Sequence, residues 1–507
     1  MNQKLIDELI AHLGFAGNRV TVLNPTTGLA SHELPQLNAE QVKTAVSAAR
    51  DNAHLWSNVS PAKRSKVLYR LHDLILENQD ELMSIVQHET GKARAHAFEE
   101  IAGGAGAARY YAKVGPKALH DRTTHAGVPL ITKTYVTHVP LGVVGVITPW
   151  NYPLALCMLD VIPALMAGNA VVQKADNQTA LTALYCRKLA IAAGLPETAW
   201  TIVVGDGAEV GNALTDTADY IAFTGSTATG RLVASRAASR LIGYSLELGG
   251  KNPMIILPNA DLAEAAEMLI GGAFGSAGQL CVSIERVYVH ESVKAEFTAI
   301  LAKKVESLKV GFSEDFTMDV GTLTSAAQLA RVDSFVQDAV STGATLVTGG
   351  KPLPEAGPFF YAPTVLTDVS HAAKLDRQEV FGPVIAVYGY GTLAEAVALA
   401  NDTEYGLNAS VVGNKHDAKA VANQIMAGTV NINEAFRATF ASLDTPMGGM
   451  KASGMGRRNG VNGLLKYTDV RAVGVHRGLL EFPSRGAQYN RMAPLLNLLS
   501  RIMRRLP

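Results

Sequence analysis

The chain has 507 residues, of which 48% are hydrophobic and 6% aromatic, and it contains 46 glycines. This length exceeds what one ordinary core supports, so we expect two or three domains of a large α/β enzyme. The 45 basic residues balance the 45 acidic residues, and a neutral chain gives no reason to expect a nucleic-acid partner.

Cysteine usage indicates a reducing compartment. Cys157, Cys186 and Cys281 form no CxxC pair, which argues against a disulfide framework or a zinc site. The first residues include acids where a signal peptide needs an apolar run. No unbroken apolar stretch is long enough to span a bilayer. We therefore predict a cytoplasmic enzyme without a bound metal.

The first hundred residues read as mainly helical. Asn38 can cap a helix that continues through Trp56, and Ser60 followed by Pro61 is a typical start of a second helix. The pattern changes after Gly115. Residues 132–139 are rich in β-branched side chains and partly alternate, which predicts a strand in an excursion from the main body.

A regular alternation of strands and helices begins at Leu141. Strand alternating with helix is typical of parallel βαβ units whose sheet is covered by helices on both faces. We predict strands at 143–147, 170–174, 201–204 and 220–224, and helices at 154–167, 180–193, 210–214 and 228–240.

A second alternating series follows Glu247, and it predicts a second α/β domain. The expected strands are 253–256, 286–289, 345–348 and 384–388, and the expected helices are 261–274 and 293–307. The sequence contains no internal repeat and no low-complexity linker, so the boundary near Glu247 is inferred from function more than from composition.

The tail, residues 477–507, has a different composition. It holds six arginines and one acid, Glu481, and its leucines form an apolar band beside Arg501, Arg504 and Arg505. A cationic amphipathic helix of this kind can lie on a membrane surface. We favour the alternative, in which the leucines pack on their own domain or on a neighbouring subunit, because the segment is short and has no Trp or Phe near its end.

Cys281 lies in a Gly-rich turn that starts at Phe274. Small residues around a thiol let a substrate approach closely, and a thiolate facing open space can act as a nucleophile. Taken alone, a single cysteine is more often a buried packing residue. The remaining motifs decide between these two interpretations.

Polar residues follow several of the predicted strands, where ligands bind in α/β sheets. Asn151 could donate a hydrogen bond to an oxyanion, and Lys174 could bind a ribose hydroxyl or a phosphate. Two Gly patterns compete for cofactor phosphates: 205–211, which includes Glu209, and 223–230, which has no acid and opens a helix. Neither fits G-x-G-x-x-G, and each signal alone is weak.

Two acidic residues stand in unusual surroundings. Glu247 lies within Leu-Glu-Leu-Gly-Gly-Lys, where burial would raise the pKa of its carboxyl group toward the range of a general base. Glu379 precedes Val-Phe-Gly-Pro and could bind a ribose, with a solvated turn as an equal alternative.

Together these motifs resemble the aldehyde dehydrogenase superfamily. The resemblance includes FxxxGQxC ending at Cys281, LELGGK around Glu247, TPWNYP around Asn151, FTGSTATG and EVFGP. It continues through residues 446–454 to Tyr467 and so covers nearly the whole chain in order. Within the superfamily the chain most resembles the actinobacterial-type NADP-linked succinate-semialdehyde dehydrogenases, notably at 283–286 and 456–460.

This resemblance implies a catalytic sequence. The Cys281 thiolate attacks the aldehyde carbon, and the Asn151 amide and the Cys281 backbone N–H hold the oxyanion. Hydride passes to the nicotinamide and leaves a thioester, which Glu247 hydrolyses by activating water. Relatives that acylate coenzyme A lack this Glu, so its presence favours a free acid as product.

The resemblance also implies the cofactor site and favours the phosphate turn at Gly225 over the pattern at 205–211. NAD-preferring members often place a Glu three residues after the Lys that corresponds to Lys174, where this chain has Asn177. Without that carboxylate a 2′-phosphate is not repelled, although Asp176 is adjacent. We therefore expect NADP to be preferred and NAD to be possible. The implied cofactor contacts are Trp150, Lys174, Asn177, Gly225, Ser226, Leu248, Glu379 and Phe381.

The substrate site departs from the better-known succinate-semialdehyde enzymes. Their two carboxylate-binding arginines correspond to Gly275 and Leu159 here. Leu156 and Leu159 suggest a partly apolar tunnel, and the long loop 433–445 offers Arg437 as a carboxylate anchor. The aromatic rings that would flank Arg437 are Phe436 and Phe440.

We therefore predict oxidation of an aldehyde, succinic semialdehyde to succinate with NADP. A solvated Arg437 is an equal alternative to the anchor and would favour an aromatic or medium-chain aliphatic aldehyde. A catalytically silent structural member is the remaining alternative, and the intact set of Asn151, Glu247 and Cys281 argues against it.

The resemblance implies two doubly wound parallel-sheet α/β domains and a small β excursion used for oligomerisation. We assign 1–116 and 139–246 to a Rossmann-like cofactor-binding domain and 247–432 to a catalytic domain. Segments 117–138 and 433–476 would bridge subunits, and 477–507 is the basic tail. Family members form homodimers or homotetramers, with the excursion pairing across subunits.

Overall fold

The computed structural model describes residues 1–15, 17–127, 131–478 and 483–504, and these residues separate into two compact units. The first unit comprises residues 1–118 and 140–468, and the second comprises 119–139 and 469–507. The first unit contains two large sheets, so both predicted α/β series lie in it.

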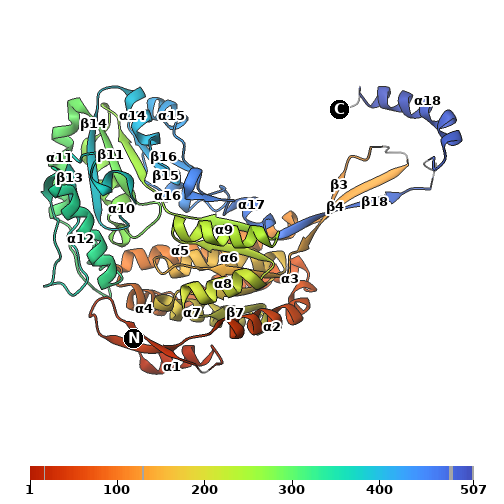
Figure 1. Ribbon diagram of the computed structural model, residues 1–507, viewed down its shortest axis with the longest axis horizontal. Helices are drawn as coiled ribbons and strands as arrows, with labels where there is room; N and C mark the ends of the chain where they lie inside the picture. The colour runs from red at the N-terminus through yellow and green to blue at the C-terminus, as the bar shows by residue number, and fades with distance from the viewer. Residues whose placement is uncertain (16, 128–130, 479–482, 505–507) are drawn as a thin grey trace. The chain divides into compact units, whose positions relative to one another are not determined.

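The first sheet has the strand order β17-β9-β8-β5-β6-β7. Its edge strand β7 is labelled in Figure 1. Neighbouring strands from β9 to β7 pair in parallel, whereas β17 pairs antiparallel with β9. The predicted strands of the first series are confirmed, and β9 and β17 were not predicted. The bounds are β5 Val143–Ile147, β6 Ala170–Lys174, β7 Trp200–Val203, β8 Tyr220–Thr224, β9 Gly243–Glu247 and β17 Gly454–Met455.

Helices cover this sheet, and their capping residues follow the sequence signals. Asn38 and Gln41 form a capping box at the start of α2, as the Asn predicted. One predicted helix, 210–214, is longer in the structure, because Asp206 caps a helix that begins at Gly207. The helices are α1 Gln3–Ala11, α2 Ala39–Ser57, α3 Pro61–Glu77, α4 Gln79–Thr90, α5 Arg94–Ala118, α6 Pro153–Ala167, α7 Ala180–Ala192, α8 Gly207–Thr217 and α9 Thr227–Ser239.

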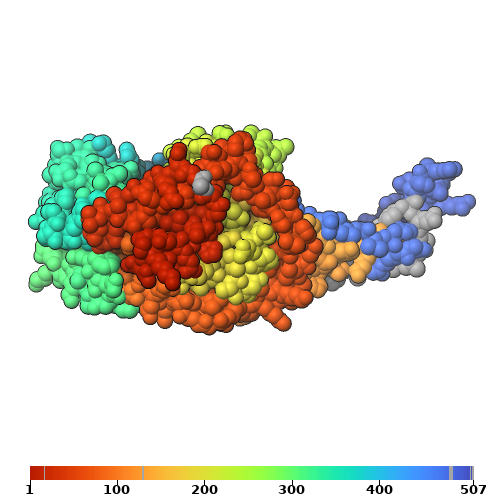
Figure 2. Space-filling model, turned by 90° about the horizontal axis from the view of Figure 1, so that it is seen from below, coloured from red at the N-terminus to blue at the C-terminus, as the bar shows by residue number. Residues whose placement is uncertain are grey.

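The N-terminal residues also form a hairpin that the helical interpretation missed. Strands β1 (Arg19–Leu23) and β2 (Ala30–Pro35) pair antiparallel. Both strands are short, β1 is largely exposed and β2 is only half-buried, so they lack the continuous apolar run that marks the central strands. In Figure 2 the red and orange N-terminal segment covers much of one face of the molecule around a yellow patch.

The second sheet has the order β12-β13-β14-β11-β10-β15-β16. All its pairs are parallel except β12 with β13. The four predicted strands are confirmed; β13, β15 and β16 were not predicted. The strands are β10 Asn252–Ile256, β11 Ile284–His290, β12 Thr345–Thr348, β13 Thr364–Thr367, β14 Val384–Tyr390, β15 Asn408–Val412 and β16 Thr429–Ile432.

Helices flank the second sheet, and a core cluster that includes Ile255, Tyr288 and Val411 is buried beside it. The predicted helices 261–274 and 293–307 are confirmed with shifted ends. The helices are α10 Leu262–Ala273, α11 Glu291–Glu306, α12 Ala326–Ser341, α13 Lys374–Arg377, α14 Leu393–Asn401, α15 Lys415–Ala422 and α16 Arg437–Phe440. The last helix of the first unit, α17 Gly460–Leu465, packs on α5 and α6 instead.

The chain crosses between the two sheets twice, once at a short link after β9 and again between β16 and β17. β9 ends at Glu247 on the first sheet, and β10 begins at Asn252 on the second. The strands β6, β8, β10 and β11 at the centre of the two sheets are buried on both faces, as parallel sheets require. The assignment of cofactor-binding and catalytic domains to the two sides of Glu247 stays a prediction.

The second unit contains a small sheet with the order β18-β4-β3 and the helix α18. The predicted strand at 132–139 is confirmed as β4. Residues 479–482 and 505–507 of the tail, including Glu481 and Arg505, lie outside the described residues. The bounds are β3 Arg122–Thr124, β4 Thr132–Pro140, β18 Thr468–His476 and α18 Gly486–Met503.

The apolar band of α18 is open in the single chain. Leu495, Leu498 and Ile502 are 40%, 55% and 50% exposed. The interpretation that we favoured, in which these leucines pack on their own domain or on a neighbouring subunit, stays a prediction. Among the described residues, no helix is both long and apolar enough to cross a membrane.

Candidate functional site

A cavity of about 320 Å³, called here the first cavity, gathers most of the predicted site residues. All three residues predicted as catalytic contribute to its wall. They come from the end of β9, the loop after β5 and the turn before β11. The lining includes Trp150, Asn151, Leu156, Thr224, Gly225, Ser226, Glu247, Leu248, Gly249, Cys281, Glu379 and Phe381.

Cys281 ends a tight turn, residues 274–281, called here the nucleophile turn. Ser276, Ala277 and Gly278 all have left-handed backbone conformations. A side chain at Gly278 would lie 2.1 Å from the carbonyl oxygen of Gly382, so only glycine fits there. The turn leaves Cys281 half-buried in the cavity wall.

The free thiol is held in its neutral form. Burial, followed by the nearby carboxyl groups of Glu379 and Glu247, raises the pKa of Cys281 to about 12. Because thiolate is the reactive form, the resting site keeps its nucleophile protonated.

Asn151 is buried and held from two sides. Its side-chain Nδ2 donates to the carbonyl oxygen of Gln279 at 2.9 Å, inside the nucleophile turn. The backbone carbonyl oxygen of Asn151 accepts a hydrogen bond of 2.7 Å from Lys92 Nζ. An amide carries two N–H donors, so the contact with Gln279 occupies one of them.

Glu247 is 5% exposed, and its Oε1 atom has no hydrogen-bond partner among the described residues. Burial raises the pKa of this carboxyl group to about 7, although Arg458 and Lys466 act to lower it. A buried oxygen without a partner is rare and marks a position that a water or substrate atom can occupy.

A buried cluster that the sequence analysis missed lies close to Glu247. Asp160 accepts hydrogen bonds from Arg458 Nε at 3.1 Å, Lys466 Nζ at 3.1 Å and Tyr467 Oη at 2.8 Å. Burial alone would raise the pKa of Asp160, but Arg458 and Lys466 bring it below its ordinary value. The sequence did contain one signal of this cluster: Asp160 is an acid inside the otherwise apolar α6, and a buried carboxylate needs a partner.

The other side of the first cavity has the features of a dinucleotide site. Ser226 caps α9 by accepting from the Thr229 N–H at 3.2 Å, so the helix N-terminus faces the cavity at Gly225. Glu379 accepts from the Gly250 N–H at 2.8 Å. Burial, followed by the nearby Glu285, raises the pKa of Glu379 to about 7.

Glycine at 249 makes room in this part of the site, because a Cβ atom there would lie 2.5 Å from a Glu379 oxygen. Phe381 lies edge-on to Trp150 with 5.6 Å between ring centroids. An open cavity, a helix N-terminus, a carboxylate and two aromatic rings fit a nicotinamide dinucleotide. Within the described ranges, no group of three His, Cys, Asp or Glu side chains is arranged to hold a metal ion.

The competing Gly pattern at 205–211 forms hydrogen bonds with other parts of the protein. The Gly205 N–H donates to Asn177 Oδ1 at 2.9 Å, and Glu209 accepts from the Ala39 N–H at 2.9 Å. Neither end of the pattern contributes to the first cavity.

Lys174 and Asn177 also lie outside the lining of the first cavity. Lys174 ends β6 and is 6% exposed. The Asn177 amide donates to Gln36 Oε1 at 2.9 Å besides accepting from Gly205. Asp176 accepts from the Gln178 N–H at 2.9 Å and so caps the short turn that follows it.

A second cavity, of about 270 Å³, contains the predicted substrate residues Leu159, Arg437 and Phe440, whereas Leu156 lies in the first. Arg437 Nε pairs with Glu99 at 3.1 Å, and the guanidinium lies over the Phe436 ring at 5.4 Å. The sequence analysis missed Glu99 and Arg109, which line the cavity from α5. The lining is Glu99, Ala102, Gly103, Gly106, Arg109, Tyr152, Ala155, Leu159, Phe436, Arg437, Phe440, Ala441 and Leu443.

The absence of the usual arginine at position 275 has a local explanation. A Cβ atom on Gly275 would lie 3.3 Å from His96 Nε2, so His96 occupies the space beside this position. His96 is buried, and burial lowers its pKa to about 3, which keeps the ring neutral.

Comparison with known proteins agrees with this geometry. The model of the aldehyde dehydrogenase family matches residues 14–473. A Mycolicibacterium smegmatis protein named "Putative succinate-semialdehyde dehydrogenase", NADP(+)-linked by its name, is 46% identical over 482 residues, which is 95% of this chain and 93% of the relative.

Solved structures extend the likeness to the fold. An NADP-dependent enzyme of E. coli superposes with a TM-score of 0.87 at 32% identity and covers 90% of this chain and 95% of its own. An NAD-dependent aldehyde dehydrogenase from Sinorhizobium meliloti gives 0.88 at 34% identity, with 93% and 94% covered. The match over nearly the whole chain, together with a site built from a cysteine, a glutamate and an asparagine in one cavity, shows that this chain belongs to the aldehyde dehydrogenase family.

Proposed function

We propose that the protein oxidises succinic semialdehyde to succinate with NADP. The observation that carries the reaction is the meeting of Cys281, Asn151 and Glu247 in the first cavity. The observation that favours a carboxylated substrate is Arg437 in the wall of the second cavity. The name of the M. smegmatis relative supports the same substrate and cofactor.

The chemistry follows from the site residues. Cys281 loses its thiol proton to water, and its sulfur then forms a bond to the aldehyde carbon. The carbonyl oxygen becomes an oxyanion that the second N–H of the Asn151 amide and the Cys281 backbone N–H stabilise. The bound dinucleotide supplies the hydride acceptor, and the Cys281 thioester remains.

Hydrolysis completes the cycle at Glu247. Its unpartnered Oε1 can accept a proton from a water molecule, which then attacks the thioester carbon and releases the acid and the thiol. The carboxyl must be ionised at this step, so the raised pKa keeps it basic enough for the task while leaving it ionised above pH 7.

Different residues would bind different chemical groups of the cofactor. The α9 N-terminus at Gly225 and Ser226 would hold the diphosphate, and Glu379 would bind a ribose hydroxyl beside Phe381. Trp150 and Leu248 would supply apolar walls. Lys174 would attract the 2′-phosphate, and Asn177 would place no negative charge against it.

The substrate assignment depends on Arg437. Its Nε is paired with Glu99, which leaves the two terminal nitrogens of the guanidinium for a carboxylate. An aromatic or medium-chain aliphatic aldehyde is the second candidate, because Leu159, Phe436 and Phe440 make much of the second cavity apolar. A catalytically silent member would have no use for the three intact catalytic residues.

A panel of aldehydes tests the assignment. Succinic semialdehyde, butanal, octanal and benzaldehyde are each assayed with NADP and with NAD. We expect the highest kcat/KM for succinic semialdehyde with NADP. A higher kcat/KM for a neutral aldehyde would establish the second candidate, and a tenfold preference for NAD would overturn the cofactor assignment.

We infer that the enzyme acts in the cytoplasm as a homodimer or homotetramer. The three cysteines are all free, which supports a reducing compartment. The strand β4 offers a sheet for pairing between subunits, and the exposed leucines of α18 offer an apolar surface for the same contact.

A further inference from the structure

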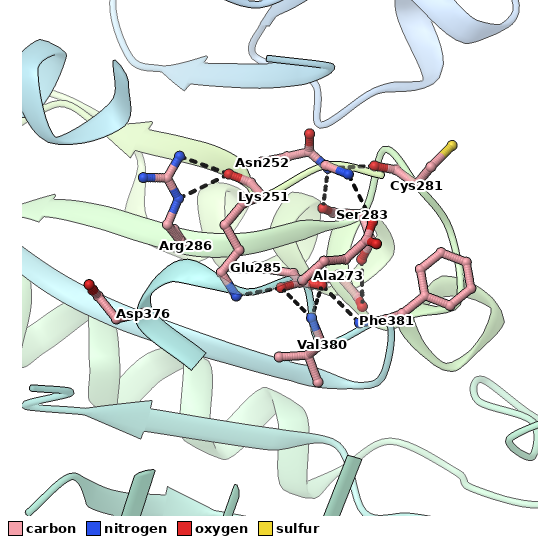
Figure 3. A network of polar contacts seen from close by, with 12 residues as sticks. Lys251, Asn252, Ala273, Cys281, Ser283, Glu285, Arg286, Asp376, Val380 and Phe381 are labelled. Carbon is pink, nitrogen blue, oxygen red and sulfur yellow. Dashed lines mark hydrogen bonds and ion pairs between the residues drawn. The ribbon is translucent and has the colours of Figure 1, made fainter. Parts of the chain in front are cut away.

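A buried ion pair lies behind the first cavity. Lys251 Nζ and Glu285 Oε2 are 2.5 Å apart, and their side chains are 0% and 4% exposed (Figure 3). Burying two charges costs several kcal/mol, and a buried ion pair is weak evidence for stability. Its presence therefore calls for another explanation.

The Glu285 carboxylate also binds the backbone of the cofactor side. The Val380 N–H donates to both of its oxygens at 3.0 Å, and the Phe381 N–H donates to Oε1 at 3.0 Å. The backbone at Phe381 has φ of +59°, a conformation that costs a bulky residue free energy. The carboxylate holds the chain in this strained conformation, with the Phe381 ring in the cavity wall.

The residue next to Lys251 binds the nucleophile turn. Asn252 Nδ2 donates to the carbonyl oxygens of Cys281 at 2.8 Å and Ser283 at 2.7 Å (Figure 3). Two consecutive side chains at the start of β10 therefore serve both walls of the cavity. Asn252 binds the backbone of the nucleophile turn, and Lys251 binds Glu285, which holds the backbone at Phe381. Arg286 fixes this strand start by donating to the Lys251 carbonyl oxygen through Nε at 2.9 Å and Nη2 at 2.7 Å.

We propose that the Lys251–Glu285 pair is a positioning device that determines the affinity for the dinucleotide. Lys251 fixes the orientation of the carboxylate, and the carboxylate fixes Val380 and Phe381 against the site where the cofactor binds. The inference rests on the proposed function, because it takes the first cavity as the cofactor site. Neither residue lines the first cavity.

A second buried pair provides a matched control. Lys92 Nζ and Glu100 Oε1 are also 2.5 Å apart and almost fully buried. Here Glu100 Oε2 accepts from the Leu154 and Ala155 N–H groups at the start of α6, while Lys92 donates to the Asn151 carbonyl oxygen. Both pairs have the same chemistry and burial, but this one holds the residue proposed to bind the oxyanion.

The test compares Glu285→Gln with Glu100→Gln. Isothermal titration measures the Kd for NADP without substrate, and steady-state assays measure kcat and the KM for the aldehyde. Loss of a charge-assisted acceptor predicts that Glu285→Gln weakens NADP binding about tenfold with the aldehyde KM unchanged. Glu100→Gln should leave the Kd for NADP within about twofold and lower kcat about tenfold.

A double variant guards against misfolding. Lys251→Met combined with Glu285→Gln removes the unpaired charge while still lacking the carboxylate, so it should fold and show the same weakened NADP binding. Wild-type affinity in a folded Glu285 variant overturns the inference. Equal weakening of NADP binding in the Glu285 and Glu100 variants also overturns the inference, because loss of either buried ion pair would then loosen the whole structure in the same way. A wild-type protein that binds neither NADP nor NAD overturns the proposed function and the inference together.

Discussion

The two cavities are built from different kinds of segment. The first is lined by strand ends and the loops directly after them, at Asn151, Thr224 and Glu247. The second is lined by one face of α5, the middle of α6 and the loop that carries α16. Strand ends in a parallel sheet converge on one edge, so the chemistry of the first cavity is fixed by the fold. Helix faces and loops can vary without disturbing that edge, so the substrate selectivity that we propose for the second cavity can change while the chemistry of the first stays the same.

Removing the nucleophile is expected to have the largest effect. Cys281→Ser should lower kcat by at least about 10⁴-fold, because a serine hydroxyl in this site has no thiolate-like reactivity. Cys186→Ser is the matched control, since Cys186 is a buried cysteine of α7 outside both cavities. It should retain turnover, and substantial activity in Cys281→Ser would remove the first cavity as the reaction site.

Replacing the base should separate the two halves of the reaction. Glu247→Gln is expected to lower steady-state turnover by about 10²- to 10⁴-fold. A stopped-flow burst of NADPH should remain, and mass spectrometry should detect the acyl group on Cys281. Loss of the burst together with turnover would show that Glu247 is needed before the thioester forms.

The pH profile follows from the pKa of Glu247, about 7. Only the ionised carboxyl acts as a base, so below pH 7 the hydrolysis-limited kcat should fall about tenfold per pH unit, and above pH 7 it should level off. The residual activity of Glu247→Gln should lack this inflection. An unchanged inflection in the variant would assign it to another group.

The second cavity should control the substrate without affecting the chemistry. Arg437→Ala should raise KM for succinic semialdehyde about 10- to 100-fold, because a charge-assisted hydrogen bond to the distal carboxylate is lost. KM for butanal should stay constant, as should both values in Arg70→Ala, an exposed control paired with Glu77. Equal effects on both aldehydes would leave Arg437 without a role in specificity.

The smallest expected effect concerns the choice between dinucleotides. Asn177→Glu should shift the ratio of kcat/KM from NADP toward NAD about tenfold, because a carboxylate would repel the 2′-phosphate. Asn177→Gln introduces no charge, so it is the control for the loss of the contacts with Gln36 and Gly205. Identical ratios in both variants would place the 2′-phosphate elsewhere.

Sequence reasoning reached the first cavity because its residues sit in motifs with a mechanism of their own. The turn at Cys281, the strand end at Asn151 and the glycines after Glu247 are each weak signals alone, and it was their order along the chain that carried the resemblance to a family. Sequence reasoning also predicted most strands of the two large sheets, including the edge strands β7 and β12, but it missed the interior strands β9, β13 and β15 as well as β1, β2, β16 and β17.

The positioning groups could not be predicted in this way. Glu285 acts on Val380 and Phe381, and Asp160 acts on Arg458 and Lys466, so each partner lies far away in the sequence. The residues next to Glu285 in the sequence do not indicate that it binds Lys251 and Val380, because these contacts form only when the sheet is assembled. Similarly, the space beside Gly275 is taken by His96, which lies on another helix.

The pairing of β17 with β9 has a consequence for biosynthesis. The strand that carries Glu247 has β8 on one side, translated just before it, and Gly454–Met455 on the other, translated long after Cys281. Until the ribosome has passed residue 455, β9 is an open sheet edge, and such an edge invites pairing with another chain. A nascent chain can thus carry Asn151, Glu247 and Cys281 and still be an aggregation-prone intermediate, and the same late closure completes the wall beside the base.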